Sequence, residues 1–174
     1  MTDADTERFR RVFDAHYTQV HAYARRRINP ADVDDVVSET FTAAWRRLDN
    51  IPAGHELPWL YGLTRRVLAN RRRGAARFVR LQARLAEQPL PSGHVESTGD
   101  DAVRAVLGRL PATDQEVLRL AAWEQLDPSE IAVVLGCSVN AATLRLSRAR
   151  KRFRLLMTET TSPRTQTTTE ASDA

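Results

Sequence analysis

Paired carboxylates and clustered arginines are the side chains whose spacing in this sequence could support chemistry. Asp35 and Glu39 lie four residues apart, which makes them neighbours on one face of a helix, where two carboxylates can act as acid and base. The four histidines are scattered without metal-ligand spacing: His16, His21, His55 and His94. We therefore expect no catalytic residue, no metal and no cofactor. We interpret Asp35 and Glu39 as the solvated start of a helix or as a docking face for a basic partner.

Arginines gather in two stretches that contain no acidic residue, residues 57–86 and 131–158. The formal net charge is only +4, so the placement of the charges is more informative than their sum. A run of one sign indicates a polyanionic partner such as nucleic acid. Trp59 and Tyr61 precede the first arginines, and rings beside cations suit a single strand whose bases stack on them. A place for Trp59 in the hydrophobic core fits the sequence equally well.

The second stretch belongs to a pattern that predicts two short helices joined by a tight turn, residues 127–154. Asp127 and Glu130 form a capping box at the first helix, and Gly136 is placed to end it in a left-handed conformation. Ser138 can cap the second helix, whose apolar face repeats at helical intervals: Ala142, Leu146, Ala149 and Phe153. This pattern is typical of a DNA-reading helix-turn-helix, although an ordinary helical hairpin with a solvated basic face also fits.

The polar side of this second helix carries the candidate base-reading residues. They are Asn140, Thr143, Leu144, Arg145, Ser147 and Arg148. A helix in the major groove can distinguish base pairs while the duplex is closed. Cys137, the only cysteine, lies in the turn, where we expect it to fill space; a single cysteine excludes an intrachain disulfide and a four-cysteine metal site.

Helical periodicity continues over the rest of the chain, so we expect an all-α protein. Helices are expected at residues 7–28, from Asp32 to about residue 48, and from Pro58 onward, with residues 1–6 frayed. Val33, Val37 and Phe41 begin the expected buried face of the second helix. Its polar face presents a docking candidate set: Asp35, Ser38, Glu39 and Thr42.

A stretch rich in Pro, Gly and Ser, residues 87–100, predicts a flexible linker between two small domains, residues 1–86 and 101–157. In the second domain, Thr113 and Glu116 predict a capping box. Residues 158–174 turn to Thr, Ser and Pro, and we expect a disordered tail. The polar N-terminus is not a signal peptide and no apolar run approaches the ~18 residues that span a bilayer, so we expect a cytoplasmic protein without membrane insertion.

Together these stretches resemble the extracytoplasmic-function (ECF) sigma factors, the minimal group of the sigma-70 family. ADVDDVVSETFTAAWRRL at residues 31–48 and PWLYGLTRRVLANRRR at residues 58–73 are similar to parts of the sigma-2 domain. Residues 110–153 are similar to the sigma-4 domain. The resemblance covers residues 9–156 and implies a sigma-2 helical bundle followed by a sigma-4 helix-turn-helix domain.

The resemblance also implies a function: binding core RNA polymerase, directing it to the −10 and −35 elements of promoters, and assisting promoter opening, with no active site. It implies that the docking candidate set meets the β′ clamp helices, that the β flap is a further contact, and that an anti-sigma factor is the regulatory partner. Residues 50–56 would capture a flipped base, and the recognition helix would read the −35 element. The melted −10 strand would be held by Trp59, Arg65, Arg66, Asn70, Arg71 and Arg73.

Three residues depart from the family pattern, so the −35 sequence of better-known members cannot be transferred. Arg66 stands where many members have Asn, Thr143 where Lys or Arg is common, and Leu144 where Ser is common. Two alternatives to a sigma factor are a helix-turn-helix repressor or activator with a sensor in its first half, and an adaptor that binds only protein. The acid-free stretch at residues 57–86 disfavours the sensor, and the basic second helix disfavours the adaptor.

Overall fold

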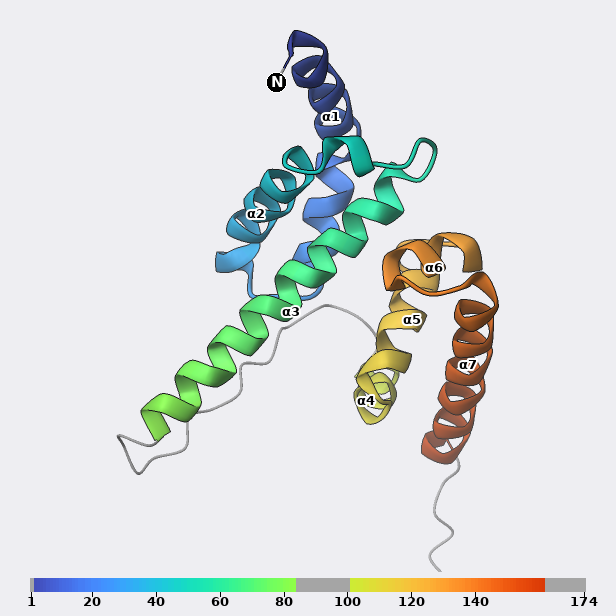
Figure 1. The fold of residues 1–174 in the computed structure, drawn as a ribbon. Helices are drawn as coiled ribbons and strands as arrows, with labels where there is room; N and C mark the ends of the chain where they lie inside the picture. Colours follow the sequence, from blue (N-terminus) through green and yellow to red (C-terminus); the bar gives the residue numbers. More distant parts are fainter. Residues whose placement is uncertain (1, 84–100, 162–174) are drawn as a thin grey trace, which may run out of the picture.

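The computed structural model describes residues 2–83 and 101–161, and within these residues all regular structure is helical, as predicted. Seven α-helices and two short 3-10 helices follow one another in the described ranges (Figure 1). The α-helices are α1 (Asp3–Arg25), α2 (Val33–Trp45), α3 (Glu56–Ala83), α4 (Asp101–Arg109), α5 (Ala112–Ala122), α6 (Pro128–Leu135) and α7 (Val139–Thr161). The 3-10 helices are η1 (Pro30–Asp32) and η2 (Leu48–Asn50).

Helices α1, α2 and α3 form the first half of the molecule and pack against one another in all three pairings. The expected buried face of α2 is confirmed, because Val33, Val37 and Phe41 are all buried. Val36 and Thr40 are buried as well, which the sequence did not predict. The reason is that α3 covers a second side of α2, and the hydroxyl of Thr40 is satisfied by donating to the Val36 carbonyl at 2.8 Å.

The starts of the first two helices differ from the predictions. Residues 3–6 are helical rather than frayed, because the Thr2 side chain accepts from the Asp5 amide while the Asp5 carboxylate accepts from the Thr2 amide. At α2, the side chain of Asp32 makes no capping hydrogen bond. Asn29 caps the preceding 3-10 helix instead, so the chain enters α2 already turned and needs no side-chain cap there.

Helices α4–α7 form the second half, and the predicted helix-turn-helix is confirmed. Asp127 and Glu130 make both bonds of the capping box, Gly136 ends α6 at φ +64°, and the Ser138 hydroxyl accepts from the Ala141 amide at 3.2 Å. Three of the four residues predicted for the buried face of α7 are buried, Ala142, Leu146 and Ala149, and the fourth, Phe153, is half-buried. Helix α7 continues to Thr161, so the prediction of a disordered tail is wrong for residues 158–161. The rest of the predicted tail, and the predicted linker at 87–100, lie outside the described residues.

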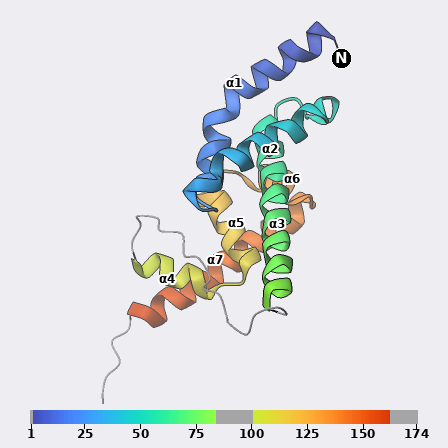
Figure 2. The same ribbon diagram turned by 90° about the vertical axis from the view of Figure 1, so that its left-hand side faces the viewer.

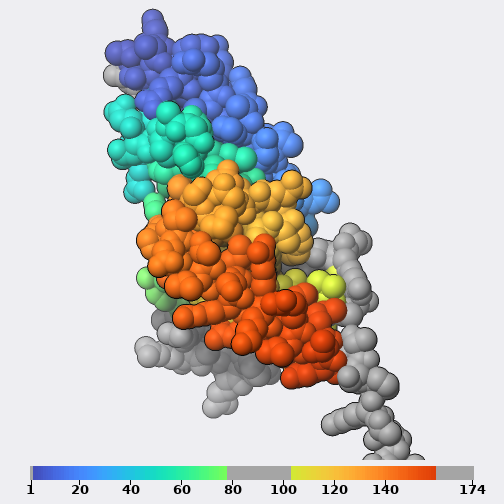
Figure 3. Space-filling model, turned by 90° about the vertical axis from the view of Figure 1, so that its right-hand side faces the viewer, coloured from blue at the N-terminus to red at the C-terminus, as the bar shows by residue number. Residues whose placement is uncertain are grey.

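The two halves pack directly on each other through α3 and α6 (Figures 1 and 2). Gly62, two turns into α3, permits this contact: a Cβ at that position would lie 3.3 Å from the Val134 carbonyl oxygen. One continuous cluster of buried apolar residues runs from α1, α2 and α3 into α5, α6 and α7. Figure 3 shows the face where α5 and α6 lie against the first half.

Candidate nucleic-acid and polymerase interfaces

The polar side of α7 presents the predicted base-reading residues to solvent. Packing fixes this orientation, because Ala142, Leu146 and Ala149 hold the opposite side against α5 and α6. All six predicted residues are exposed: Asn140, Thr143, Leu144, Arg145, Ser147 and Arg148. Leu144 is 47% exposed although it is apolar, so this face offers both apolar and polar contacts. Such a face can meet thymine methyl groups as well as polar base edges.

Four of the six residues predicted to hold a melted strand lie on one side of α3. They line a wide cleft between the two halves and are exposed: Arg65, Arg66, Asn70 and Arg73. Arg145 of α7 lines the same cleft. It therefore belongs both to the predicted base-reading face of α7 and to the basic cleft that the α3 residues line. The cleft also includes Arg25, Arg72 and Arg104, so its walls are strongly basic and suit a polyanion.

The two aromatic residues near the start of α3, Trp59 and Tyr61, are turned toward protein. Trp59 is half-buried and packs against the hydrophobic core, which supports the core interpretation that the sequence left open. Tyr61 is buried and stacks on Tyr23 of α1, with the ring centroids 4.6 Å apart. Burial raises the pKa of the Tyr61 phenol to about 12.

The acidic face of α2 already holds a cation in this structure. The Arg71 guanidinium of α3 donates through Nε to Glu39 Oε1 at 3.1 Å, and its Nη2 atom lies 3.6 Å from Asp35 Oδ2. Asp32 Oδ1 lies 4.0 Å from Nη1 of the same arginine. The hydrogen bond to Glu39 raises the pKa of Arg71 above its usual value. The structure thus pairs a predicted strand-binding residue with two predicted polymerase contacts.

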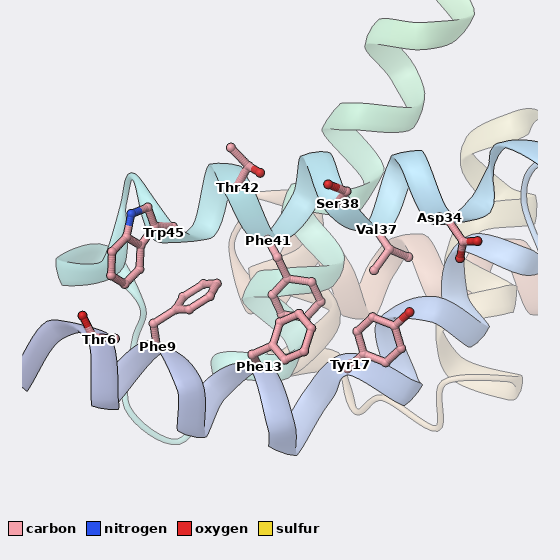
Figure 4. A pocket seen from close by; sticks show the side chains of 10 residues that line it. All are labelled: Thr6, Phe9, Phe13, Tyr17, Asp34, Val37, Ser38, Phe41, Thr42 and Trp45. Carbon is pink, nitrogen blue, oxygen red and sulfur yellow. The ribbon is translucent and has the colours of Figure 1, made fainter.

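The other two predicted polymerase contacts, Ser38 and Thr42, line an aromatic groove between α1 and α2 (Figure 4). The groove has a volume of about 560 Å³. Its apolar walls are Phe9, Phe13, Tyr17, Val37, Phe41 and Trp45. The rings contact one another, as in the tilted pair of Phe13 and Phe41, whose ring centroids lie 4.7 Å apart. The docking candidate set therefore borders an apolar groove on one side and Arg71 on the other.

A buried ionic cluster joins the two halves, and the sequence did not predict it. It consists of Tyr23, Arg26 and Arg27 from the first half, with Glu116 and Glu124 from the second, and we name it the interdomain cluster. Tyr23 donates its hydroxyl to Glu116 at 2.8 Å, and Arg27 donates to Glu124 at 2.8 Å. The side chains of Arg27 and Glu124 are only 3% and 1% exposed. Arg26 also pairs with Glu124.

The neighbours of Arg27 in the interdomain cluster favour its charged form. Burial alone lowers the pKa of Arg27, but Tyr23, Glu116 and Glu124 outweigh burial and raise it. Burial raises the pKa of Tyr23 well above its usual value. The predicted capping box of Thr113 and Glu116 is wrong, since α5 begins at Ala112 without a side-chain cap and Glu116 reaches α1 instead.

Two further findings concern the described residues only. In residues 2–83 and 101–161, no three His, Cys, Asp or Glu side chains come together as a group that could hold a metal ion. Of the described helices, none taken singly is long and apolar enough to cross a membrane. Helices α6 and α7 together have the length and apolar composition of a membrane span, but the chain bends by 103° between them.

Comparison with known proteins identifies both halves. Residues 12–78 match the family model of sigma-70 region 2, and residues 100–153 match that of sigma-70, region 4. The chain is 32% identical over 148 residues to the RNA polymerase sigma factor CnrH of Cupriavidus metallidurans, with 75% of each protein covered. It is 29% identical over 135 residues to the ECF RNA polymerase sigma factor EcfG of Rhodopseudomonas palustris, with 74% of this chain and 73% of that protein covered.

Two solved structures of similar fold are complexes with a second protein. The structure of CnrH with the cytosolic domain of CnrY matches with a TM-score of 0.57 at 31% identity, over 88% of this chain and 89% of that chain. The structure of the sigma factor RpoE of Bartonella quintana with the anti-sigma factor NepR matches with a TM-score of 0.63, over 86% of this chain and 96% of that chain. At 21% identity, the second likeness concerns the fold alone.

The chain belongs to the sigma-70 family of RNA polymerase sigma factors. Within the family it is a sigma factor of the ECF type, with a region 2 half and a region 4 half. Proteins of this type direct RNA polymerase to promoters for transcription initiation, and that is the function of this chain.

Proposed function

We propose that three surfaces of this sigma factor divide the work of initiation. The docking candidate set on α2 binds the β′ clamp helices of core polymerase, and the β flap provides a further contact. The basic side of α3 holds the melted −10 strand, and α7 reads the −35 element in the closed duplex. The protein acts in this scheme by binding, without a reaction of its own, in the cytoplasm where promoter DNA and polymerase meet.

The observation that carries this proposal is the orientation of α7. Its small and apolar residues are buried, while its candidate base-reading residues are exposed on a helix that follows a tight, glycine-capped turn. A second helix presented in this way fits the major groove. The cleft-lining arginines of α3 support the assignment of strand binding to that helix, since phosphates favour a basic groove. Residues 1–86 and 101–157 are the corresponding domains.

We also propose that an anti-sigma factor regulates this chain. Both solved relatives described above were captured with a second protein, named as an anti-sigma factor for RpoE and as the cytosolic domain of CnrY for CnrH. The aromatic groove between α1 and α2 supports such a partner, because apolar side chains of an incoming helix can fill it. Ser38 and Thr42 line the groove, so a protein seated there would compete with polymerase docking.

Reading both promoter elements at once requires the halves to separate. Elements about 25 base pairs apart are about 85 Å apart along B-DNA. The longest described helix, α3, has 28 residues and spans about 42 Å. Because α3 and α6 are in direct contact, we propose that this structure is a closed state and that polymerase binding favours an open one.

Run-off transcription with and without core polymerase tests the proposed function. We expect specific transcripts only when the chain and core polymerase are both present, and weak binding of promoter duplex by the chain alone. Tight and specific duplex binding without core polymerase, together with no transcript in its presence, would instead support a helix-turn-helix repressor.

A further inference from the structure

Arg71 differs from the other predicted strand-binding arginines in where its side chain points. Arg65, Arg66 and Arg73 line the cleft between the halves, whereas Arg71 does not. Its guanidinium lies among the carboxylates of Asp35 and Glu39 on α2 and Asp32 on η1. Only 29% of the Arg71 side chain is exposed, although the carboxylates around it are about half exposed or more.

The pairing places one cation on the face where polymerase is proposed to dock. Asp35 and Glu39 lie one turn apart, so the same guanidinium reaches both, through Nη2 at 3.6 Å and through Nε at 3.1 Å. A basic surface that docks on these carboxylates needs the same oxygen atoms. The Arg71 contacts occupy part of the acceptor capacity of these carboxylates and offset their negative charge, so a basic partner that docks here must compete with Arg71.

We propose that Arg71 is an intramolecular counter-ion that masks the polymerase-docking face of α2 in the free protein and is displaced when core polymerase docks. The inference rests on the proposed function, because it assumes that α2 is the docking face. Displacement also frees the guanidinium of Arg71 for the phosphates of the melted strand, on the helix that carries the other strand-binding arginines. Polymerase docking and strand binding then favour each other, since each removes a partner from the same ion pair.

The first experiment measures the affinity of the labelled full-length chain for core polymerase in the absence of DNA. Arg71→Gln is compared with wild type and with Arg77→Gln, which removes the same charge from an exposed position on the same helix. We expect Arg71→Gln to bind about two- to fivefold more tightly, in the range of an exposed ion pair, and Arg77→Gln to bind like wild type. In an Asp35→Asn, Glu39→Gln background, Arg71→Gln should have no further effect.

The second experiment measures the affinity for a labelled single-stranded DNA of about 12 nucleotides without polymerase. Asp35→Asn with Glu39→Gln should strengthen strand binding about two- to fivefold by releasing Arg71, and this gain should shrink when Arg71→Gln is also present. The double-mutant comparison removes the general effect of lost negative charge. Thermal unfolding of each variant verifies that α2 and α3 remain packed.

The outcomes separate this inference from the proposed function. If wild type binds core polymerase but Arg71→Gln binds equally or more weakly, the masking role of Arg71 is wrong while the sigma-factor function stands. If the strand-binding gain is equal with and without Arg71, the coupling to DNA is wrong. If the wild-type chain fails to bind core polymerase, the proposed docking and the inference fall together.

Discussion

At the scale of single residues, the exposed side chains of α7 and the buried phenols of the first half lead to separate predictions. Arg148 is exposed on the reading face and has no acidic neighbour between residues 131 and 158. Thr143, by contrast, donates its hydroxyl to the Val139 carbonyl at 2.9 Å, so part of its polar capacity is used within the helix. We therefore choose Arg148 as the long side chain with which to test a base contact.

Replacing Arg148 with alanine should weaken the dependence on the −35 element by about 1–3 kcal/mol, because a bidentate contact to a base edge would be lost. The measurement is transcription with core polymerase from a promoter with an intact −35 element and from one with a scrambled element. Arg150→Ala, also exposed on α7, is the control and should lower both transcripts by similar factors. An unchanged ratio for Arg148→Ala would remove it from the base-reading residues.

Tyr61 makes stability depend on alkaline pH. Its pKa is raised to about 12 by burial, above an unfolded value near 10, so the folded state keeps a proton that the unfolded state loses. The stabilisation is complete below about pH 10 and is lost as the pH rises toward 12. We expect Tyr61→Phe to flatten the fall of the unfolding free energy in this window, measured by urea unfolding, while the exposed Tyr17→Phe keeps the wild-type slope.

At the scale of helices, the crossing of α3 and α6 depends on a glycine. A Cβ added to Gly62 would lie 3.3 Å from the Val134 carbonyl oxygen, whereas a Cβ added to Gly74 on the same helix would have no neighbour within 4 Å. The two glycines therefore test packing and helix propensity separately. One stands at a close contact, and the other carries only the entropic cost of a glycine inside a helix.

Gly62→Val should push α3 and α6 apart and lower the melting temperature, because the branched side chain meets backbone atoms that cannot rotate away. Gly74→Ala should stabilise the protein by about 0.5–1 kcal/mol, since alanine is the better helix former and has open space there. Thermal unfolding of both variants checks these signs. A Gly62→Val protein as stable as wild type would show that the crossing tolerates a larger separation.

Most of the helices and the helix-turn-helix were predictable from the sequence, because their signals are local. The capping box of Asp127, the left-handed Gly136 and the apolar repeat of α7 all lie within a few residues of the structure they produce. A similar local signal, Thr2 with Asp5, marks the true start of α1 and could have corrected the expectation of a frayed end. The interior Gly62 was likewise a sign of close helix packing.

The contacts between distant segments were not predictable in the same way. Glu116 fits a capping box by local rules, but its partners Tyr23 and Arg27 lie about 90 residues away in the sequence. The pairing of Arg71 with Glu39 likewise joins two predicted sites that the sequence treats as independent. The packing of α3 on α2 and the docking of the second half on the first decide these partners, so periodicity and capping signals carry no information about them.

At the scale of the whole molecule, the interdomain cluster and the α3–α6 contact hold the halves in one body. Arg27 and Glu124 are buried at the junction, so removing either leaves the other with one charged partner fewer in a site shielded from water, where Arg27 keeps only Glu116 and Glu124 keeps only Arg26. Exposed ion pairs elsewhere on the surface contribute much less to the free energy of unfolding. The stability of the closed state should therefore respond strongly to a change at this junction.

Glu124→Gln should destabilise the closed state by about 3 kcal/mol, because it removes the charge that Arg26 and Arg27 face in a buried site. We expect a larger radius of gyration in small-angle X-ray scattering and faster proteolysis. Glu159→Gln, which removes an exposed partner of Arg109, is the matched control and should leave both measurements unchanged. If the Glu124→Gln protein stayed compact, the apolar contacts alone would be enough to hold the two halves together.

The fit of Gly62 against Val134 also bears on how such proteins can be recombined. A chimera that joins the first half of this chain to the second half of a relative would place an unmatched α6 surface on α3. If the relative's α6 backbone approached more closely than here, even Gly62 would be crowded, and any side chain at position 62 would press on that backbone and hold the hybrid splayed. Grafting α3 and α6 from the same parent is therefore the sensible rule for building hybrid regulators on this scaffold.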